Sequence, residues 1–221
     1  MFNSRIKIRF LILFILLAPF TTILAQNSDK KSQDILKGVS TKYRSLTSVK
    51  ADFSLSSQNP KTNAKSTESG TLYIKGDKYR LQIAGQDVIS DGKSRWTFVK
   101  DANEVQIDNQ RNDENSITPT TIFTMYEKGW VSKFIGESKQ GAIMVQQLEL
   151  VPADPKKKAI FKVKLTINKT EKSIMSAVMY DKNGQIQTIN VSKYIPNGVK
   201  DDSLFIFNAS NFPGAEVIDL R

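Results

Sequence analysis

The sequence predicts a mainly β fold (α+β): a single strongly curved antiparallel sheet, or unclosed β-barrel, of about 10–11 strands. An N-terminal helix and a second, short helix complete the prediction. Between residues 49 and 207, short segments alternate apolar and polar residues, and turn signals separate them. Asp91-Gly92 is one such signal, because a tight hairpin turn needs a positive φ angle that glycine adopts without steric cost. So many consecutive hairpins favour one curved sheet, and no internal repeat divides it.

Residues 1–25 have the layout of a cleavable signal peptide. Basic residues precede an apolar run from Phe10 to Leu24, and Ala25 offers a small residue for cleavage. The alternative is an uncleaved membrane anchor, but the run is short for a span of about 20 residues and contains Pro19. We therefore expect export to the periplasm and a single mature domain at residues 26–221. The chain has no cysteine, so disulfides cannot stabilise it there.

The mature chain is expected to begin with a polar leader at residues 26–33, followed by an amphipathic helix at residues 34–45. Residues 49–57 alternate and predict the first strand, and the polar residues 60–68 predict a loop. The apolar residues that recur at helical spacing are Ile35, Leu36, Val39, Tyr43 and Leu46.

Residues 70–107 predict a meander of short antiparallel strands with one apolar face. Alternation does not distinguish a filled barrel from a hollow one, so this face meets either a packed interior or a ligand. The residues expected on the apolar face are Leu72, Ile74, Tyr79, Leu81, Ile83, Trp96, Phe98, Val105 and Ile107.

Thr118 and Pro119 predict the start of a short helix over residues 120–127, with threonine as N-cap and proline in the first turn. Its large side chains cover more of the helix surface than one narrow apolar stripe. The helix therefore either packs under the sheet or covers an apolar concavity through exchangeable contacts. These side chains are Ile122, Phe123, Met125 and Tyr126.

The second half of the chain returns to alternating segments separated by turns. Strands are expected at residues 130–137, 143–151, 160–167, 173–180 and 185–194, with a last short strand at Phe205–Phe207. Loops or turns are expected at residues 108–115, 152–155, 168–172 and 181–184, and a tail at residues 212–219.

The composition argues against most enzymes. The chain has no histidine, which removes serine–histidine nucleophiles, the usual general base and nearly all zinc sites. Carboxylate pairs such as Asp201-Asp202 and Asp113-Glu114 lie in polar loop sequence. A solvated surface explains them better than a glycosidase pair does. We therefore expect a binding protein with no metal and no cofactor.

The formal net charge of the chain is +10. The positive excess is spread over many short lysine-containing turns, apart from Lys156-Lys157-Lys158. A solvated turn is the favoured interpretation of this triplet, and attraction to an anionic membrane or an acidic partner is the other. Aromatic residues do not interleave with the basic ones, so a nucleic-acid partner is not expected.

A series of local motifs runs from residue 35 to residue 219. After the opening helix come Val49-Lys-Ala-Asp-Phe53, Gly70-Thr-Leu-Tyr-Ile-Lys75, Ser90-Asp-Gly-Lys93 before Trp96-Thr-Phe98, Thr118-Pro119, Leu148-Glu-Leu-Val-Pro152, Asp181-Lys-Asn-Gly184, and Phe205-Ile-Phe207 before Pro213-Gly214 and Val217-Ile-Asp219. Each motif alone is weak. In this order, the motifs resemble the LolA family, the periplasmic carriers of outer-membrane lipoproteins.

The resemblance implies an unclosed β-barrel in which helices form a lid over a hydrophobic cavity. It implies a monomeric carrier that takes acylated lipoprotein cargo from an inner-membrane ABC exporter and shields the acyl chains across the periplasm. The cargo is then released at the outer membrane, to an acceptor that the sequence does not identify. The residues expected to line the cavity are Leu72, Ile74, Tyr79, Leu81, Ile83, Trp96, Phe98, Ile122, Phe123, Met125 and Tyr126.

One position departs from the family. The best-known members have an arginine directly after the residue that corresponds to Lys75, and this arginine holds the closed lid by hydrogen bonds. Gly76 stands here instead. Alternation places both Arg80 and Arg95 on the outer face of the sheet, so neither replaces it. We expect lid closure to be weaker or differently arranged.

Two other classes of protein fit the same residues. One is a carrier or sensor of another lipid or glycolipid with the same architecture. The other is a packed structural or interaction domain with no cavity. An enzyme is the least favoured class.

Overall fold

The computed structural model describes residues 29–110, 120 and 124–221, which form one α-helix, twelve strands and three short 3-10 helices. The helices are α1 (Lys30–Arg44), η1 (Met125–Glu127), η2 (Asp202–Phe205) and η3 (Ala209–Asn211). The strands are β1 (Val49–Asn59), β2 (Ala64–Lys75), β3 (Lys78–Ile83), β4 (Gln86–Ser90), β5 (Ser94–Val99), β6 (Glu104–Asn109), β7 (Trp130–Gln140), β8 (Ile143–Pro152), β9 (Ile160–Asn168), β10 (Ser173–Asp181), β11 (Ile186–Pro196) and β12 (Glu216–Asp219).

These strands form one sheet in the order β12-β6-β5-β4-β3-β2-β1-β11-β10-β9-β8-β7. Neighbouring strands pair antiparallel, except that β12 pairs parallel with β6. β1 pairs with β11 at the centre and so joins the two halves of the sheet. β12 and β7 lie at opposite ends of the order and do not pair, so the predicted unclosed barrel is confirmed.

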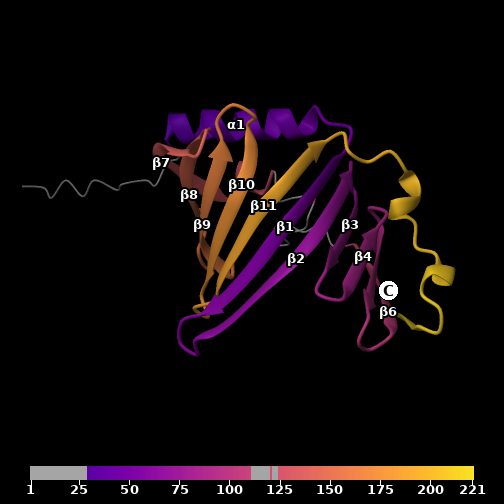
Figure 1. Ribbon diagram of the computed structural model, residues 1–221. Coiled ribbons are helices and arrows are strands. Elements are labelled where there is room, and N and C mark those ends of the chain that lie inside the picture. Colours follow the sequence, from indigo (N-terminus) through magenta and orange to yellow (C-terminus); the bar gives the residue numbers. More distant parts are fainter. Residues whose placement is uncertain (1–28, 111–119, 121–123) are drawn as a thin grey trace, which may run out of the picture.

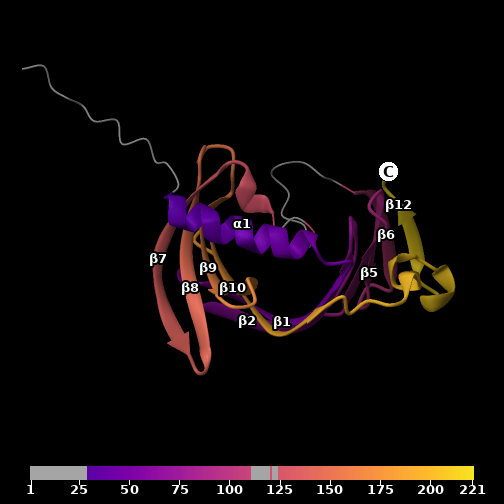
Figure 2. The same ribbon diagram turned by 90° about the horizontal axis from the view of Figure 1, so that it is seen from above.

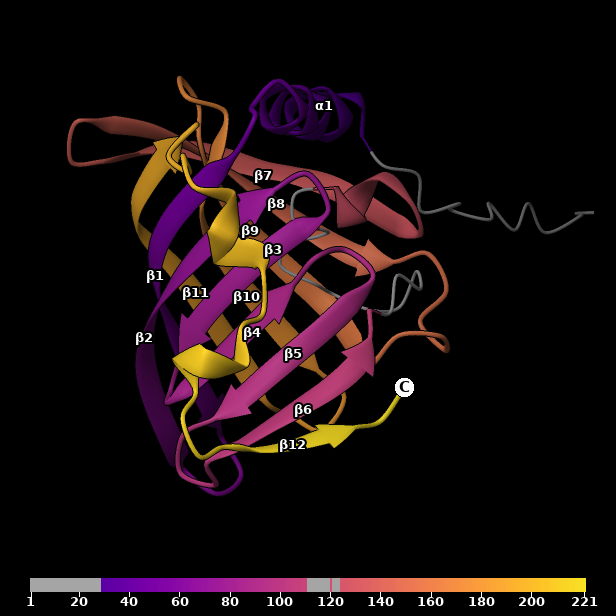
Figure 3. The ribbon, with the colours of Figure 1, turned by 90° about the vertical axis from the view of Figure 1, so that its right-hand side faces the viewer.

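The sheet curls into an open trough, and α1 crosses its concave side at one end (Figure 1, Figure 2). The C-terminal segment with η2 and η3 runs over the convex side of β3 to β6, before β12 joins the sheet edge (Figure 3). The two sides of the sheet are thus covered at different places. No helix formed by the described residues has the length and hydropathy needed to cross a bilayer.

α1 begins earlier than predicted because Asp29 caps it. The Asp29 carboxylate accepts hydrogen bonds from Ser32 N at 2.7 Å and from Phe134 N of β7 at 2.6 Å. Ser32 is fully buried, and its Oγ lies 3.0 Å from Ser132 O of β7. The predicted polar leader is therefore wrong for residues 30–33, which are helical and fixed to the edge strand of the sheet.

The main core lies between α1 and the concave side of the sheet. Leu36 and Val39 enter it from the helix and are 5% and 2% exposed. Burial of apolar surface is the dominant stabilising term in folding, so this packing holds α1 across the trough. The other buried apolar residues of this core are Val49, Ala51, Ile74, Tyr79, Tyr126, Trp130, Leu148, Leu150, Val163, Leu165, Ile167, Ile174, Ala177 and Met179.

β2 begins inside the segment that was predicted to be a loop at residues 60–68. Its first residues pair with the end of β1, with Ala64 opposite Asn59. The side chains of residues 64–69 are exposed. Backbone pairing alone therefore extends this hairpin, and the sequence shows no apolar alternation there.

The last predicted strand, Phe205–Phe207, is wrong. Residues 202–205 form η2, because the Asp201 carboxylate accepts hydrogen bonds from Ser203 N at 2.8 Å and from its hydroxyl at 2.6 Å. The segment predicted as a tail at residues 212–219 instead supplies β12, one of the twelve strands of the sheet.

Replacing Asp29 by alanine removes the cap of α1 and two hydrogen bonds to a charged acceptor. We expect the free energy of unfolding to fall by ~2 kcal/mol, measured by denaturant unfolding near neutral pH. Burial by itself would raise the pKa of Asp29, but its hydrogen bonds with Ser32 and Phe134 lower it below the usual 3.8. Asp29 therefore contributes its full stabilisation well above pH 3.8, and this stabilisation is lost as the pH falls through the folded-state pKa of Asp29.

Asp34→Ala, on the exposed side of the same helix, is the control for this change. An equal loss of stability in both variants, or an Asp29 effect that does not decline in acid, would contradict the role of Asp29 as the cap.

Candidate functional site

The concave side of β1, β2 and β3 carries an apolar wall. Six of its residues belong to the core under α1 or pack against it: Val49, Ala51, Leu72, Ile74, Tyr79 and Leu81. The structure thus brings the predicted residues Leu72, Ile74, Tyr79, Leu81 and Ile83 together on one face of the sheet. Cross-strand pairing arranges the wall in three rows: Val49, Ile74 and Tyr79; Ala51, Leu72 and Leu81; and Phe53, Gly70 and Ile83.

The rows of the apolar wall differ in burial. In the first row, Ile74 is 1% exposed and Tyr79 is 3% exposed. Leu72, Leu81 and Ile83, in the other two rows, are only half-buried. Apolar surface therefore continues along the concave side beyond the closed core, which is the property that a site for an apolar ligand requires.

Gly70 keeps room for the Phe53 ring on this wall. A Cβ atom at Gly70 would lie 2.7 Å from Phe53 Cζ and 2.7 Å from Gln82 O, closer than Cβ atoms come to other atoms in real proteins. Any side chain at this position would displace the ring, so the glycine fixes where this part of the apolar surface lies.

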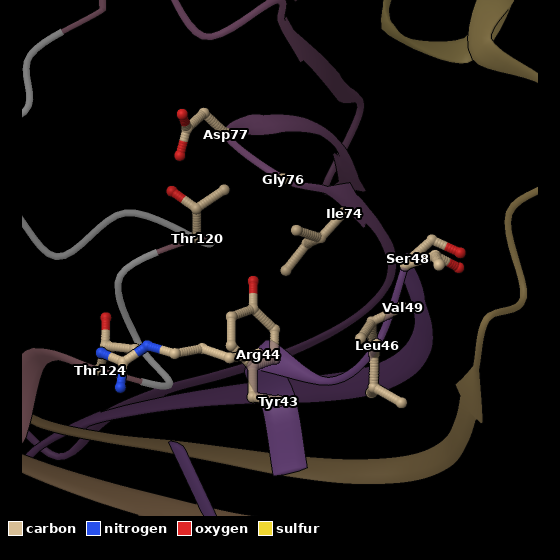
Figure 4. Close-up of a pocket in the computed structure, with 11 residues that line it drawn as sticks. Tyr43, Arg44, Leu46, Ser48, Val49, Ile74, Gly76, Asp77, Thr120 and Thr124 are labelled. Carbon is tan, nitrogen blue, oxygen red and sulfur yellow. The ribbon is translucent and has the colours of Figure 1, made fainter. Parts of the chain in front are cut away.

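A cavity of about 590 Å³ opens where the end of α1 meets the start of β1 and the turn between β2 and β3 (Figure 4). Ligand pockets usually have about 300–1,000 Å³. Val49 and Ile74 belong both to the cavity and to the first row of the apolar wall, so the two adjoin. The other lining residues are Tyr43, Arg44, Leu46, Thr47, Ser48, Gly76, Asp77, Thr120 and Thr124.

The rim of this cavity is polar with little net charge. Arg44 forms an ion pair with Glu127 and so connects α1 to η1. The Tyr43 hydroxyl points into the space between Ile74 and Thr120 (Figure 4). Burial raises the pKa of Tyr43 to about 12, so this hydroxyl is neutral at ordinary pH.

Gly76 lies in the turn between β2 and β3, at the cavity wall. Its φ angle is +58°, a left-handed conformation that costs other residues about 1–2 kcal/mol. A Cβ atom there would meet nothing within 4 Å. The turn conformation explains the glycine, and the space beside it is open where the best-known family members are expected to have an arginine side chain.

Only part of the predicted lid helix falls within the described residues. Ile122 and Phe123 lie outside them, and Met125 begins η1. Tyr126 is 6% exposed in the core, and its hydroxyl accepts a hydrogen bond from Ser40 of α1 at 3.0 Å. Burial raises the pKa of Tyr126 to about 12, although the hydrogen bond with Ser40 opposes this shift. Tyr126 therefore packs against α1.

Trp96 and Phe98 lie on the convex side of the sheet, so their prediction as part of the concave apolar face is wrong. Leu81 pairs with Val88, and Val88 pairs with Thr97, which places Thr97 rather than its neighbours on the concave side. Side chains alternate along a strand, so the residues on either side of Thr97 point the other way. The apolar residues on the convex side of this region are Ile89, Trp96, Phe98, Val105 and Ile107.

The C-terminal segment covers this convex apolar surface with aromatic rings. Trp96 stacks on Phe207 with 5.8 Å between ring centroids, and Phe98 lies 4.8 Å from Phe212. Phe207 and Phe212 stack on each other at 5.5 Å. Trp96 and Phe98 therefore form a second core that holds the C-terminal segment, and the structure does not bring them to the concave apolar wall.

Arg95 lies on the concave side, in contrast to the outward position predicted from alternation, whereas Arg80 lies on the convex side as predicted. Arg80 binds Asp87 through two nitrogens, Nε at 2.9 Å and Nη2 at 2.6 Å. Arg95 binds Asp108 through Nη2 alone, at 2.8 Å. The signal that was missed is the register between strands, since alternation within β5 does not say which side faces inward.

Residues 44–208 match the model of a protein family described as outer membrane lipoprotein carrier protein LolA. The chain belongs to the LolA family. Members of this family are periplasmic and bind lipid or lipoprotein cargo. No protein with a curated description matches the sequence.

Solved structures of low sequence identity align with most of this LolA-family chain. An uncharacterised conserved protein from Thermus thermophilus has a TM-score of 0.58 at 14% identity, with 86% of this chain and 99% of that chain covered. The lipoprotein LppX from Mycobacterium tuberculosis has a TM-score of 0.49 at 13% identity, with 79% and 99% covered. A LolA-superfamily protein from Nitrosomonas europaea has a TM-score of 0.42 at 15% identity, with 80% and 97% covered.

Replacing Phe98 by alanine removes a half-buried ring from the convex aromatic core. We expect the free energy of unfolding to fall by ~2 kcal/mol, measured by denaturant unfolding, with no change in the binding of a fluorescent fatty acid. Ile83→Ala, on the concave wall, is the comparison and should weaken that binding. If Phe98→Ala weakened the binding as strongly as Ile83→Ala does, the separation of the two sides would be wrong.

Proposed function

We propose that this LolA-family protein carries lipoproteins across the periplasm by holding their acyl chains against the concave apolar wall. It receives its cargo from an inner-membrane ABC exporter and releases it at the outer membrane. In this proposal residues 1–25 are the signal peptide, and the mature chain, residues 26–221, acts as a monomer and not as an enzyme.

The observation that carries the proposal is the half-buried state of Leu72, Leu81 and Ile83 beside a cavity of about 590 Å³. Removing one CH2 group from water contributes about 0.8 kcal/mol, so a sixteen-carbon chain gains on the order of 12 kcal/mol when it is fully buried. A wall that buries each chain only in part provides enough affinity for retention and still permits release.

The cavity rim suits the junction between acyl chains and polar cargo. Tyr43 supplies a neutral hydroxyl, and Arg44 is already paired with Glu127. The rim thus offers polar groups without a strong field of one sign, which fits a cargo whose polar part is a polypeptide that differs from one lipoprotein to the next.

A carrier of another lipid or glycolipid is the second candidate. Gly76 favours it, because the arginine that closes the lid in the best-known members is replaced and the space beside Gly76 is open. Mass spectrometry of the lipids that copurify with the protein separates the two candidates, since a lipoprotein carrier should yield acylated protein and not free glycolipid.

Replacing Leu81 by glutamate places a charge in the middle row of the apolar wall. We expect retention of a fluorescent diacylated lipopeptide to fall by at least about a hundredfold, because an acyl chain would have to desolvate the carboxylate. Equilibrium binding followed by fluorescence anisotropy measures this loss.

Ser69→Glu introduces the same charge on the exposed convex side of β2 and should leave binding unchanged. Circular dichroism confirms that both variants fold. A folded Leu81→Glu variant that binds as well as the unaltered protein would remove the concave wall from the site.

A further inference from the structure

The concave side of the sheet has two walls of different chemistry. On β1 to β3 it is apolar, as described above. On β5 and β6 an acyl chain would strip water from charged groups without replacing their hydrogen bonds, so acyl chains are directed to the first wall. The concave residues of the second wall are Arg95, Thr97, Val99, Glu104, Gln106 and Asp108.

The two walls meet at a buried polar group. Ser90 pairs with Tyr79 of the apolar wall on one side and with Arg95 of the polar wall on the other. The Tyr79 hydroxyl donates to Gln110 Oε1 at 3.2 Å, and Ser90 Oγ lies 3.1 Å from the same atom. Ser90 is 0% exposed and Tyr79 3%, so this boundary is a fixed part of the fold.

Arg95 has an unmet hydrogen-bonding group at this boundary. Within the described part of the chain, its Nε is buried and has no hydrogen-bond partner, whereas Arg80 on the convex side uses Nε and Nη2 together on Asp87. A buried donor without a partner reduces stability until an acceptor reaches it. The Arg95 side chain as a whole is 38% exposed although Nε itself is covered, so the guanidinium must turn before an acceptor in the trough can reach Nε.

The charges on the second wall indicate which acceptor fits. Arg95 is paired with Asp108 at 2.8 Å, and Glu104 adds a second negative charge while it accepts a hydrogen bond from Gln106. One positive and two negative groups repel a phosphate, whereas an uncharged carbonyl oxygen can accept the remaining N–H without adding charge.

We propose that the polar wall of β5 and β6 is a subsite for the uncharged, ester-bearing glyceryl head of the acylated cargo, with Arg95 Nε–H donating to a carbonyl oxygen of that head. The inference rests on the proposed function and extends it, because it assigns the acyl chains to one wall of the trough and their head group to the other.

The test compares two synthetic lipopeptides that differ only in the linkage of their alkyl chains, one with ester bonds and one with ether bonds that lack carbonyl oxygens. The unaltered protein should bind the ester form about tenfold more tightly, because a hydrogen bond from a charged donor is lost in the ether form. Arg95→Lys keeps the charge beside Asp108 but has no Nε–H, and it should bind both forms equally. Arg80→Lys, the same change on the convex side, should keep the preference.

Equal binding of the ester and ether forms by the unaltered protein would overturn this inference and leave the proposed function intact. Failure to bind either form would contradict the proposed function itself. Tighter binding of phosphatidylglycerol than of the ester lipopeptide, with loss of that binding in Arg95→Lys, would show an anionic head-group site and overturn the assignment. Because the ester and ether comparison uses the unaltered protein, the test stands even if a variant does not fold.

Discussion

Between β3 and β5 the apolar residues of one continuous sheet change from the concave to the convex side. Each side must therefore be covered at a different place, because exposed apolar surface is unfavourable. α1 covers the concave side at one end, and the C-terminal segment covers the convex side through Phe207 and Phe212. The half-buried wall of β1 to β3 lies between these two covers. The polar wall with Arg95 has the same origin, because on β5 and β6 the apolar side chains face the convex side and leave mostly polar ones on the concave side.

α1 is held at both of its ends, which defines the cavity at its C-terminal end. Asp29 and Ser32 attach its start to β7, while Ser40 and Arg44 attach its second half to Tyr126 and Glu127. Neutral groups make the contact with Tyr126, and the ion pair of Arg44 is exposed to solvent. The helix is therefore a fixed edge of the site, and the affinity for acyl chains depends on the wall of strands below it.

Local signals predict most of this fold. Alternation and turn residues identify nearly all strands, because both are properties of short segments. Local signals do not predict the start of α1, because Asp29 is also bound by Phe134, far away in the sequence. Alternation alone places Trp96 and Phe98 on the wrong side, because the faces of successive strands depend on register. Ser90 pairs with Arg95, so four residues lie between these partners, two more than in a tight two-residue hairpin. A difference of two residues leaves the faces unchanged, so both turn lengths place Arg95 on the concave side. Counting residues through the turn therefore predicts the side on which Arg95 lies.

Native mass spectrometry of the protein, purified gently from a periplasmic fraction, tests whether the concave wall holds acyl chains. We predict a complex with an acylated lipoprotein, which dissociates when Leu81 is replaced by glutamate. A mass equal to that of the polypeptide alone, together with no uptake of added diacylated lipopeptide, would contradict it. The concave wall would then be part of an ordinary packed interior.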